Sequence, residues 1–145
     1  MNEKKIIGYT SGVFDLFHIG HLNILRNAKS LCDFLVVGVT TDEVTLDMKG
    51  HLPIIPFSER IQIVESIEFV DKAIPKSTKA IEDIWNIYEF NIMIKGDDWK
   101  GTNKGNNLEK ELAEFGIKIK YLPYTEHTSS TILRNIISNF DKTFS

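Results

Sequence analysis

Two histidines stand where an apolar run gives way to a helical pattern. The segment Gly12-Val13-Phe14-Asp15-Leu16-Phe17-His18-Ile19-Gly20-His21 follows the short run Ile6–Tyr9 and precedes apolar residues at helical spacing. A helix N-terminus offers free N–H groups and a positive dipole end, so a phosphate can bind there. Gly20 lets the backbone come close, and two imidazoles add directed donors. The segment therefore predicts a phosphate site, although a four-residue pattern also arises by chance as two incidental histidines at a helix start.

A second polar segment follows a later apolar run. Gly96-Asp97-Asp98-Trp99 comes directly after Asn91–Lys95, and an aromatic face beside carboxylates suits a polar base. The segment predicts a nucleobase contact. The alternative is a solvated loop with a packed tryptophan.

A third segment is rich in hydroxyl groups at the start of the last helical stretch. Ser129, Ser130 and Thr131 stand in a row, and Arg134 follows one turn later. Hydroxyls and free N–H groups together would hold a terminal phosphate. Each hydroxyl alone is an ordinary helix cap, but three exceed what one cap needs.

The elements that must position these segments alternate between strands and helices. We predict strands over 5–9, 34–39, 73–75, 91–95 and 117–122, and helices over 19–31, 58–68, 78–90, 108–115 and 130–139. Loops are expected over 49–57 and 97–107, with a frayed tail over 141–145. Such alternation predicts one α/β domain over 1–145, a Rossmann-like five-stranded parallel sheet with helices on both faces. Ligands are then expected beyond the carboxyl ends of the strands, where all three polar segments fall.

Composition and charge exclude several classes of protein. The chain has 145 residues, 42% hydrophobic and 26% charged, which is ordinary for a globular protein and unlike a disordered one. A net charge of -3 argues against a general nucleic-acid or membrane-surface partner. The apolar runs are too short to span a bilayer, and the first residues lack the apolar region of a secretion signal. A single cysteine, Cys32, excludes an intramolecular disulfide and favours a cytoplasmic location.

Taken in order, the three segments resemble the HxGH nucleotidyltransferase superfamily, and particularly its cytidylyltransferase family. His18-Ile19-Gly20-His21 matches HxGH, and Gly96–Trp99 resembles the small bacterial glycerol-3-phosphate cytidylyltransferases. The family's C-terminal signature runs Arg-Thr-Glu-Gly-Ile-Ser-Thr-Thr, which Thr125, Glu126, Ser129 and Thr131 match. Tyr124 stands in place of the arginine, and His127-Thr128 in place of Gly-Ile.

The resemblance implies a reaction and a role for each residue. It implies transfer of CMP from CTP to glycerol 3-phosphate or a related phosphorylated alcohol or sugar, with Mg²⁺ carried by CTP. His18 and His21 would contact the α-phosphate, while Lys49 and Arg60 would contact the acceptor and bridging oxygens. Ser129 to Thr131 with Arg134 would hold the terminal phosphates, and Asp15 would orient a histidine or the loop. For Lys49 the alternative is a solvated loop lysine, and for Arg60 a surface ion pair with Glu59 or Glu65.

The resemblance also implies partners and leaves competing functions open. It implies a homodimer through 65–70, where Glu68 replaces an arginine, and a product, CDP-glycerol, used for a cell-surface or capsule polymer. The string Ser129-Ser130-Thr131-Ile132-Leu133-Arg134 also resembles adenylyltransferases that make a nucleotide cofactor. Tyr124 equally suits a catalytically inactive nucleotide-binding regulatory module. A dinucleotide-binding protein is disfavoured, because no Gly-x-Gly-x-x-Gly follows the first strand.

Overall fold

The fold alternates strands and helices along the whole described chain. A computed structural model describes residues 5–78, 80–123 and 129–144. Its elements are, in order, β1 (Ile7–Gly12), α1 (Ile19–Lys29), β2 (Phe34–Thr40), α2 (Asp42–Lys49), α3 (Phe57–Glu65), β3 (Lys72–Lys76), α4 (Ile81–Tyr88), β4 (Ile92–Gly96), the 3-10 turn η1 (Asp97–Trp99), α5 (Asn103–Ala113), β5 (Lys118–Leu122) and α6 (Ser130–Phe144).

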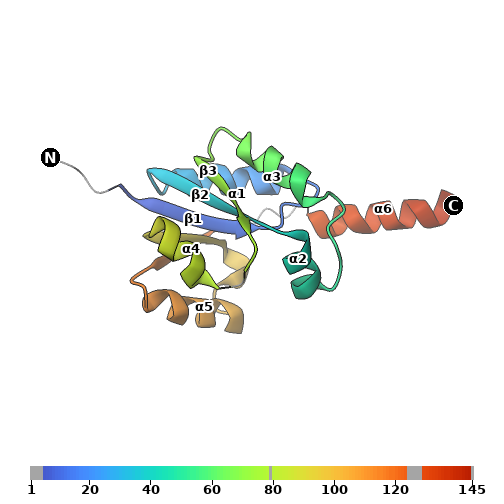
Figure 1. Ribbon diagram of the computed structural model, residues 1–145. Helices are drawn as coiled ribbons and strands as arrows, with labels where there is room; N and C mark the ends of the chain where they lie inside the picture. The colour runs from blue at the N-terminus through green and yellow to red at the C-terminus, as the bar shows by residue number, and fades with distance from the viewer. Residues whose placement is uncertain (1–4, 79, 124–128, 145) are drawn as a thin grey trace.

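All five strands join one parallel sheet, as the sequence predicts. The strand order is β3-β2-β1-β4-β5, so β1 lies at the centre (Figure 1). Residues of β1 from Ile7 to Gly12 pair with Phe34 to Val39 of β2, and Tyr9 pairs with Met93 of β4. From β1 the chain adds β2 and β3 on one side, and it then crosses to add β4 and β5 on the other side. The crevice beyond the carboxyl end of β1 is therefore the expected ligand position.

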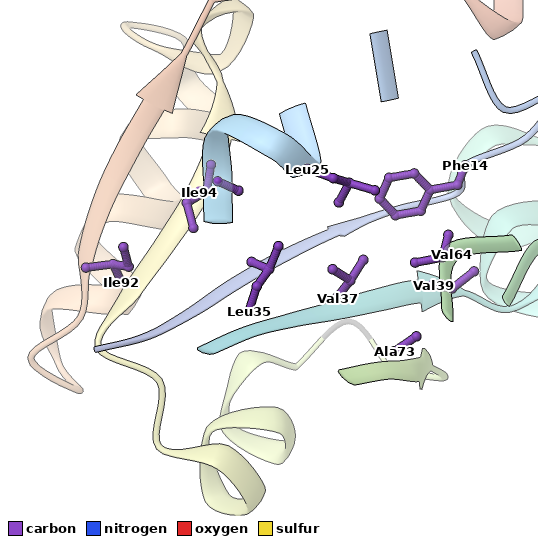
Figure 2. Close-up of a cluster of buried hydrophobic side chains, with 10 residues drawn as sticks. Phe14, Leu25, Leu35, Val37, Val39, Val64, Ala73, Ile92 and Ile94 are labelled. Atoms are coloured by element: carbon purple, nitrogen blue, oxygen red, sulfur yellow. The ribbon is translucent and has the colours of Figure 1, made fainter. Parts of the chain in front are cut away.

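One face of the sheet is covered by α1 and α3. Leu35, Val37 and Val39 of β2 point to this face, where they meet Leu25 of α1 and Val64 of α3 (Figure 2). These side chains are buried because β2 is a continuous apolar run, the pattern of a strand covered on both sides.

The other face is covered by α4 and α5. Tyr9, Val36 and Met93 point to this side and pack against Ile84 of α4 and Leu112 of α5. Every second residue of a strand points to the same face, and apolar residues at helical spacing give each helix one apolar side. The packing of these surfaces forms a hydrophobic core on each face of the sheet.

Several element boundaries differ from the prediction. The helix α2 is absent from the prediction; Thr41 begins it by accepting a hydrogen bond from the N–H of Val44, and Gly50 ends it in the left-handed conformation. The helix α5 begins at Asn103 rather than Leu108, because Thr102 caps it by accepting from the N–H of Gly105. The helix α6 reaches Phe144, so the expected frayed tail is largely helical.

The carboxyl ends of the strands point towards α2 and α6. Figure 1 shows α2 beside these ends and α6 extending away from the body of the sheet. No helix within the described residues combines the length and apolar character needed to cross a membrane.

Candidate active site

The two histidines form the N-terminal cap of α1. The N–H of Gly20 donates to Nδ1 of His18 at 3.0 Å, and the N–H of His18 donates to Nδ1 of His21 at 3.2 Å. The two rings stack with their centroids 3.9 Å apart. His18 therefore takes the position that a serine or aspartate usually holds at a helix start, and this cap fixes both rings.

These hydrogen bonds also fix which ring nitrogen carries the proton. Because Nδ1 of each ring accepts a hydrogen bond, the proton of the neutral imidazole lies on Nε2, which becomes a donor. Burial, with the neighbouring His18 and Lys49, lowers the pKa of His21 to about 3 despite Asp15 nearby. Burial also lowers the pKa of His18. Both rings are thus neutral Nε2–H donors at pH 7.

One of these donors has no partner within the described part of the chain. Nε2 of His18 is buried without a hydrogen bond, and so is Nε of Arg134 on α6. A buried N–H group without an acceptor costs about 1–3 kcal/mol, so such groups mark positions where a ligand supplies the acceptor.

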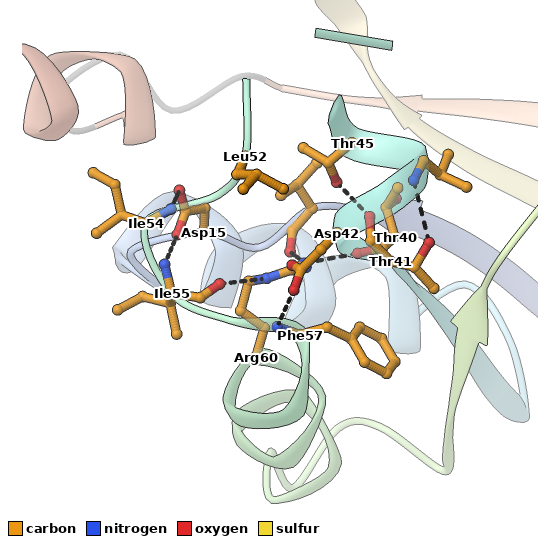
Figure 3. A network of polar contacts seen from close by, with 12 residues as sticks. Asp15, Thr40, Thr41, Asp42, Thr45, Leu52, Ile54, Ile55, Phe57 and Arg60 are labelled. Carbon is orange, nitrogen blue, oxygen red and sulfur yellow. Dashed lines mark hydrogen bonds and ion pairs between the residues drawn. The ribbon is translucent and has the colours of Figure 1, made fainter. Parts of the chain in front are cut away.

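Asp15 joins three segments that are distant in sequence. Its carboxylate accepts from the N–H groups of Ile54 and Ile55, each at 2.9 Å, and from Nη2 of Arg134 at 2.8 Å (Figure 3 shows the two backbone contacts). Burial alone would raise the pKa of Asp15, but these donors outweigh it and lower that pKa. Asp15 is only 2% exposed, and Phe14 and Leu16 on either side of it adopt left-handed backbone conformations. The loop is thereby held in a single shape.

A pocket of about 110 Å³ lies among the predicted residues, and we call it the histidine pocket. Four segments form it: the end of β1 with the loop that follows, the first turn of α1, the end of α2 and the start of α6. Its lining residues are Gly12, Val13, Phe14, Asp15, His21, Lys49, Ser130, Thr131 and Arg134. Every one of these positions was singled out from the sequence, and the fold brings them together across more than 120 residues of chain.

Lys49 lies at the mouth of this pocket, at the end of α2. Burial and the nearby guanidinium of Arg134 lower the pKa of its ammonium group, while Asp15 opposes this shift. Lys49 and Arg134 thus repel each other, and an anion placed between them would relieve the repulsion.

The structure corrects the expected role of Arg60. Its side chain is 1% exposed and donates to the carbonyl oxygens of Val13, Thr40 and Ile55, and Nη2 forms an ion pair with Asp42 at 2.7 Å (Figure 3). With its guanidinium enclosed by protein oxygens, Arg60 does not extend to a phosphate. It is a positioning residue that joins the loop after β1 to β2, α2 and α3. Neither Glu59 nor Glu65 is its partner.

The start of α6 combines capping with pocket formation. The hydroxyl of Ser129 accepts from the N–H of Ile132, which is an ordinary cap. Ser130 donates its hydroxyl to the backbone oxygen of Asp15, and Thr131 is exposed at the pocket. Thr125, like Tyr124 and residues 126–128, lies outside the described residues.

The segment Gly96–Trp99 does not form the expected crevice of two acids and an indole. Asp97 and Asp98 are exposed, whereas the indole of Trp99 faces a second pocket of about 190 Å³ on the α4 and α5 side of the sheet. We call this second pocket the lysine pocket, because Lys76 and Lys95 line it together with Tyr9, Met48, Trp99, Glu111 and apolar side chains of α4 and α5.

Sequence reasoning missed the two lysines and the partners of Asp15 and Arg60. Lys76 and Lys95 lie near the carboxyl ends of β3 and β4. Because alternate residues of a strand point to the same face, the sequence could have shown that both lysines lie on the α4 and α5 side. The contacts of Asp15 with Ile54 and Ile55 use backbone N–H groups, so the types of these two residues could not have indicated them.

The described residues contain no group of three or more histidines, cysteines, aspartates or glutamates arranged to hold a metal ion. The candidate anion ligands are instead N–H donors, hydroxyls and cations.

An open parallel sheet with donors at a helix N-terminus beyond its central strand defines a nucleotide-binding α/β class. Comparison with known proteins specifies the family. The cytidylyltransferase-like family model matches residues 9–136. Glycerol-3-phosphate cytidylyltransferase of Bacillus spizizenii is 38% identical over 135 residues, covering 90% of this chain and 95% of that one.

Two further relatives extend the comparison. Ethanolamine-phosphate cytidylyltransferase of Dictyostelium discoideum is 36% identical, covering 95% of this chain and 39% of its own length. The crystal structure of a lipopolysaccharide core biosynthesis protein from Thermoplasma volcanium superposes with a TM-score of 0.71 at 27% identity, covering 86% of this chain and 100% of that one. The chain belongs to the cytidylyltransferase-like family and is an enzyme of the nucleotidyltransferase class.

Proposed function

We propose that this enzyme transfers CMP from CTP to glycerol 3-phosphate or a closely related phosphorylated alcohol or sugar. One observation carries the proposal: the two stacked histidines share a tautomer, and Nε2 of His18 is a buried donor without an acceptor in the described chain. Such preorganised donors suit a phosphate group whose charge grows during reaction.

The proposed reaction needs no general base. A phosphate monoester has a second pKa near 6, so the acceptor is mostly a dianion at pH 7. One of its oxygens attacks the α-phosphorus of CTP in line; a new P–O bond forms and the bond to the β-phosphate oxygen breaks. Pyrophosphate leaves with the bonding electron pair, and no proton changes place on the protein. The enzyme's task is to hold two anions together and stabilise the transferring group.

The residues divide this task among them. His18 and His21 donate from Nε2 to the α-phosphate, and Lys49 balances the charge between donor and acceptor phosphates. Arg134, with Ser130 and Thr131, receives the terminal phosphates. Mg²⁺ carried by CTP would supply positive charge to the leaving pyrophosphate.

The relatives support a phosphorylated alcohol as the acceptor without choosing one. The names of two of them specify glycerol 3-phosphate and ethanolamine phosphate. The first matches this chain along nearly its full length, which is why we place glycerol 3-phosphate first.

We also propose a cytoplasmic homodimer, for which exposed apolar side chains give support. Ile132 and Ile136 lie one turn apart on α6 and are 46% and 58% exposed, and Ile63 on α3 is 41% exposed. Light scattering with size-exclusion chromatography tests this, and a monomer at micromolar concentration would contradict it.

The test of the reaction is pyrophosphate release by the purified protein with Mg²⁺. CTP, ATP, GTP and UTP are each combined with glycerol 3-phosphate and a panel of phosphorylated alcohols and sugars, and His21→Ala serves as the matched control. We expect release only with CTP and a phosphorylated acceptor together. Release with ATP instead would identify an adenylyltransferase, and no release with any pair would identify a nucleotide-binding module.

A further inference from the structure

We propose that the lysine pocket binds a second anionic group of the acceptor, a carboxylate or a phosphate, in addition to the phosphate that reacts. This inference rests on the proposed function and narrows it, because it selects among phosphorylated acceptors those that carry two acidic groups.

Both lysines line one pocket, and one of them contacts a hydroxyl at the centre of the sheet. Nζ of Lys76 lies 3.3 Å from Oγ of Ser11 on β1, which it reaches across β2. Lys95, near the end of β4, lines the same pocket, and the two ammonium groups are close enough for each charge to act on the other. Two ammonium groups thus face one pocket, with a hydroxyl in contact with one of them, a donor set that suits an oxyanion.

A glycine of β2 leaves room for the contact between Lys76 and Ser11. Gly38 pairs with Ser11, and a Cβ added there would lie 2.2 Å from the Tyr9 hydroxyl, so no side chain fits. Because Gly38 has no side chain, the Tyr9 hydroxyl fits against β2. The side chain of Lys76 can also extend over β2 at this position to reach Ser11.

The charges of the two lysines are not balanced within the described chain. Neither lysine forms an ion pair there; Glu111 is exposed at the pocket, and Asp98 acts on Lys95 only as a nearby charge. Burial, and then the ammonium of Lys76, lower the pKa of Lys95 to about 8, and burial lowers that of Lys76 as well. Burying cations without counter-charges is costly, and an anionic ligand would remove that cost.

The wall opposite the lysines is rigid and aromatic. Nζ of Lys95 lies 4.1 Å from the centroid of the Trp99 ring. The carbonyl oxygen of Trp99 accepts from the hydroxyl of Thr102 at 2.6 Å, and a Cβ on Gly105 would lie 2.0 Å from that oxygen. The cap of α5 therefore holds Trp99 in place, so the pocket is formed before a ligand arrives.

The lysine pocket adjoins the histidine pocket but faces the other side of the sheet. Met48 lines the lysine pocket and its chain neighbour Lys49 lines the histidine pocket. Ser11, which Lys76 contacts, precedes Gly12 of the histidine pocket. The two pockets therefore border one another at the end of α2, and we place one acidic group of the acceptor in each. Because Phe14 and His21 pack on the α1 side whereas the lysines lie on the α4 and α5 side, the lysines hold a different group from the reacting phosphate.

The test compares glycerol 3-phosphate with two acceptors that each carry one additional acidic group. 3-Phosphoglycerate carries a carboxylate where glycerol 3-phosphate carries a hydroxymethyl group, and glycerol 1,3-bisphosphate carries a second phosphate. Binding of each is measured by calorimetry with the α,β-methylene analogue of CTP present, for the wild type, Lys76→Met, Lys95→Met and the control Lys118→Met. Lys118 is an exposed lysine at the start of β5.

We expect the wild type to bind 3-phosphoglycerate or glycerol 1,3-bisphosphate about ten- to hundredfold more tightly than glycerol 3-phosphate. This is the range of affinity gain for one charge-assisted hydrogen bond. Lys95→Met and Lys76→Met should remove that preference and leave glycerol 3-phosphate and the CTP analogue unaffected, while Lys118→Met keeps it. The relative strength of the carboxylate and bisphosphate ligands identifies the group.

Three results would overturn the inference: no preference in the wild type, equal weakening of all acceptors in the lysine variants, or weakened binding of the CTP analogue. Equal weakening would assign the lysines to the reacting phosphate, and weakened nucleotide binding would assign the pocket to CTP. A preserved preference without pyrophosphate release would instead contradict the proposed reaction and leave the anion site standing.

Discussion

The carboxylate of Asp15 lies 2.8 Å from the guanidinium of Arg134, although 119 residues separate them in the chain. This ion pair connects the loop after β1, which carries the histidines, to α6. It also orients Arg134, whose Nε remains buried without an acceptor among the described residues. Arg134 is therefore anchored through Nη2, while its Nε is the donor that a ligand could use.

We predict that Asp15 and Arg134 act as a unit. Asp15→Asn should lower the free energy of unfolding by about 1–3 kcal/mol, because it leaves Arg134 without its counter-charge and weakens the contacts to Ile54 and Ile55. Urea denaturation of both single variants and the double variant Asp15→Asn/Arg134→Gln measures the coupling. Strictly additive losses would contradict it.

We predict that His18 has separable capping and phosphate-binding roles. His18→Ala removes both, whereas His18→Asn keeps an oxygen that can accept from the N–H of Gly20 and loses the distal Nε2–H. Both variants should lower turnover about 10²-fold or more, but His18→Asn should be nearly as stable as the wild type. Turnover and thermal unfolding are measured together. Near-normal turnover of His18→Asn would show that only the cap matters.

We predict that His21 stays neutral well into the acid range. Its pKa of about 3 lies below the ordinary value of 6.5, so the folded state binds fewer protons than the unfolded state between these values. The contribution of His21 to stability is therefore complete above pH 6.5 and decreases as the pH falls towards 3. Nitrogen-15 NMR of the free protein should record a neutral Nε2–H tautomer at pH 5. An imidazolium signal for His21 at that pH would refute the donor assignment.

We predict that Arg60 acts through the fold rather than through the substrate. Arg60→Met leaves Asp42 and the carbonyl oxygens of Val13, Thr40 and Ile55 without their donor, so the free energy of unfolding should fall by about 3–5 kcal/mol. Chemical denaturation measures this. A stable variant with a raised KM for the acceptor would restore the role predicted from sequence.

We predict that Lys95 lowers the stability of the free enzyme. Its pKa is about 8 in the fold against 10.5 in the unfolded chain, because burial and Lys76 disfavour the charge more than Asp98 favours it; Glu111 is the other acid of the pocket. Lys95→Met should therefore raise the free energy of unfolding by about 1–2 kcal/mol below pH 8, with the gain shrinking as the pH rises towards 10.5. Denaturation at pH 7 and pH 10 tests the sign, and a destabilised variant at pH 7 would contradict it.

The sequence predicted the structure well where only one kind of structural element could explain a pattern. The apolar run of β2, flanked by helical periodicity, correctly predicts a parallel strand inside the sheet, because such a strand is covered on both faces. The polar segments that follow β1 and β5 predict the histidine pocket because parallel strands bring their carboxyl ends to one edge, whereas Gly96–Trp99 lies outside that pocket.

The sequence was less informative where several partners compete for one side chain. An arginine near a helix start can contact a phosphate, a carboxylate or carbonyl oxygens, and the three carbonyls that enclose Arg60 come from distant backbone. Trp99 was similarly ambiguous, because the cap of α5 at Thr102, not its acidic neighbours, decides where the indole faces.

The central claim is that the donors at the start of α1 act on the α-phosphate of CTP. It is tested most directly by following label from [α-³²P]CTP into an acid-stable product, with Mg²⁺ and a phosphorylated acceptor, in the wild type and His21→Ala side by side. We predict label in a product containing both CMP and the acceptor, formed about 10²-fold more slowly by the variant. Equal rates in the two proteins, or no transfer to any acceptor, would contradict the account.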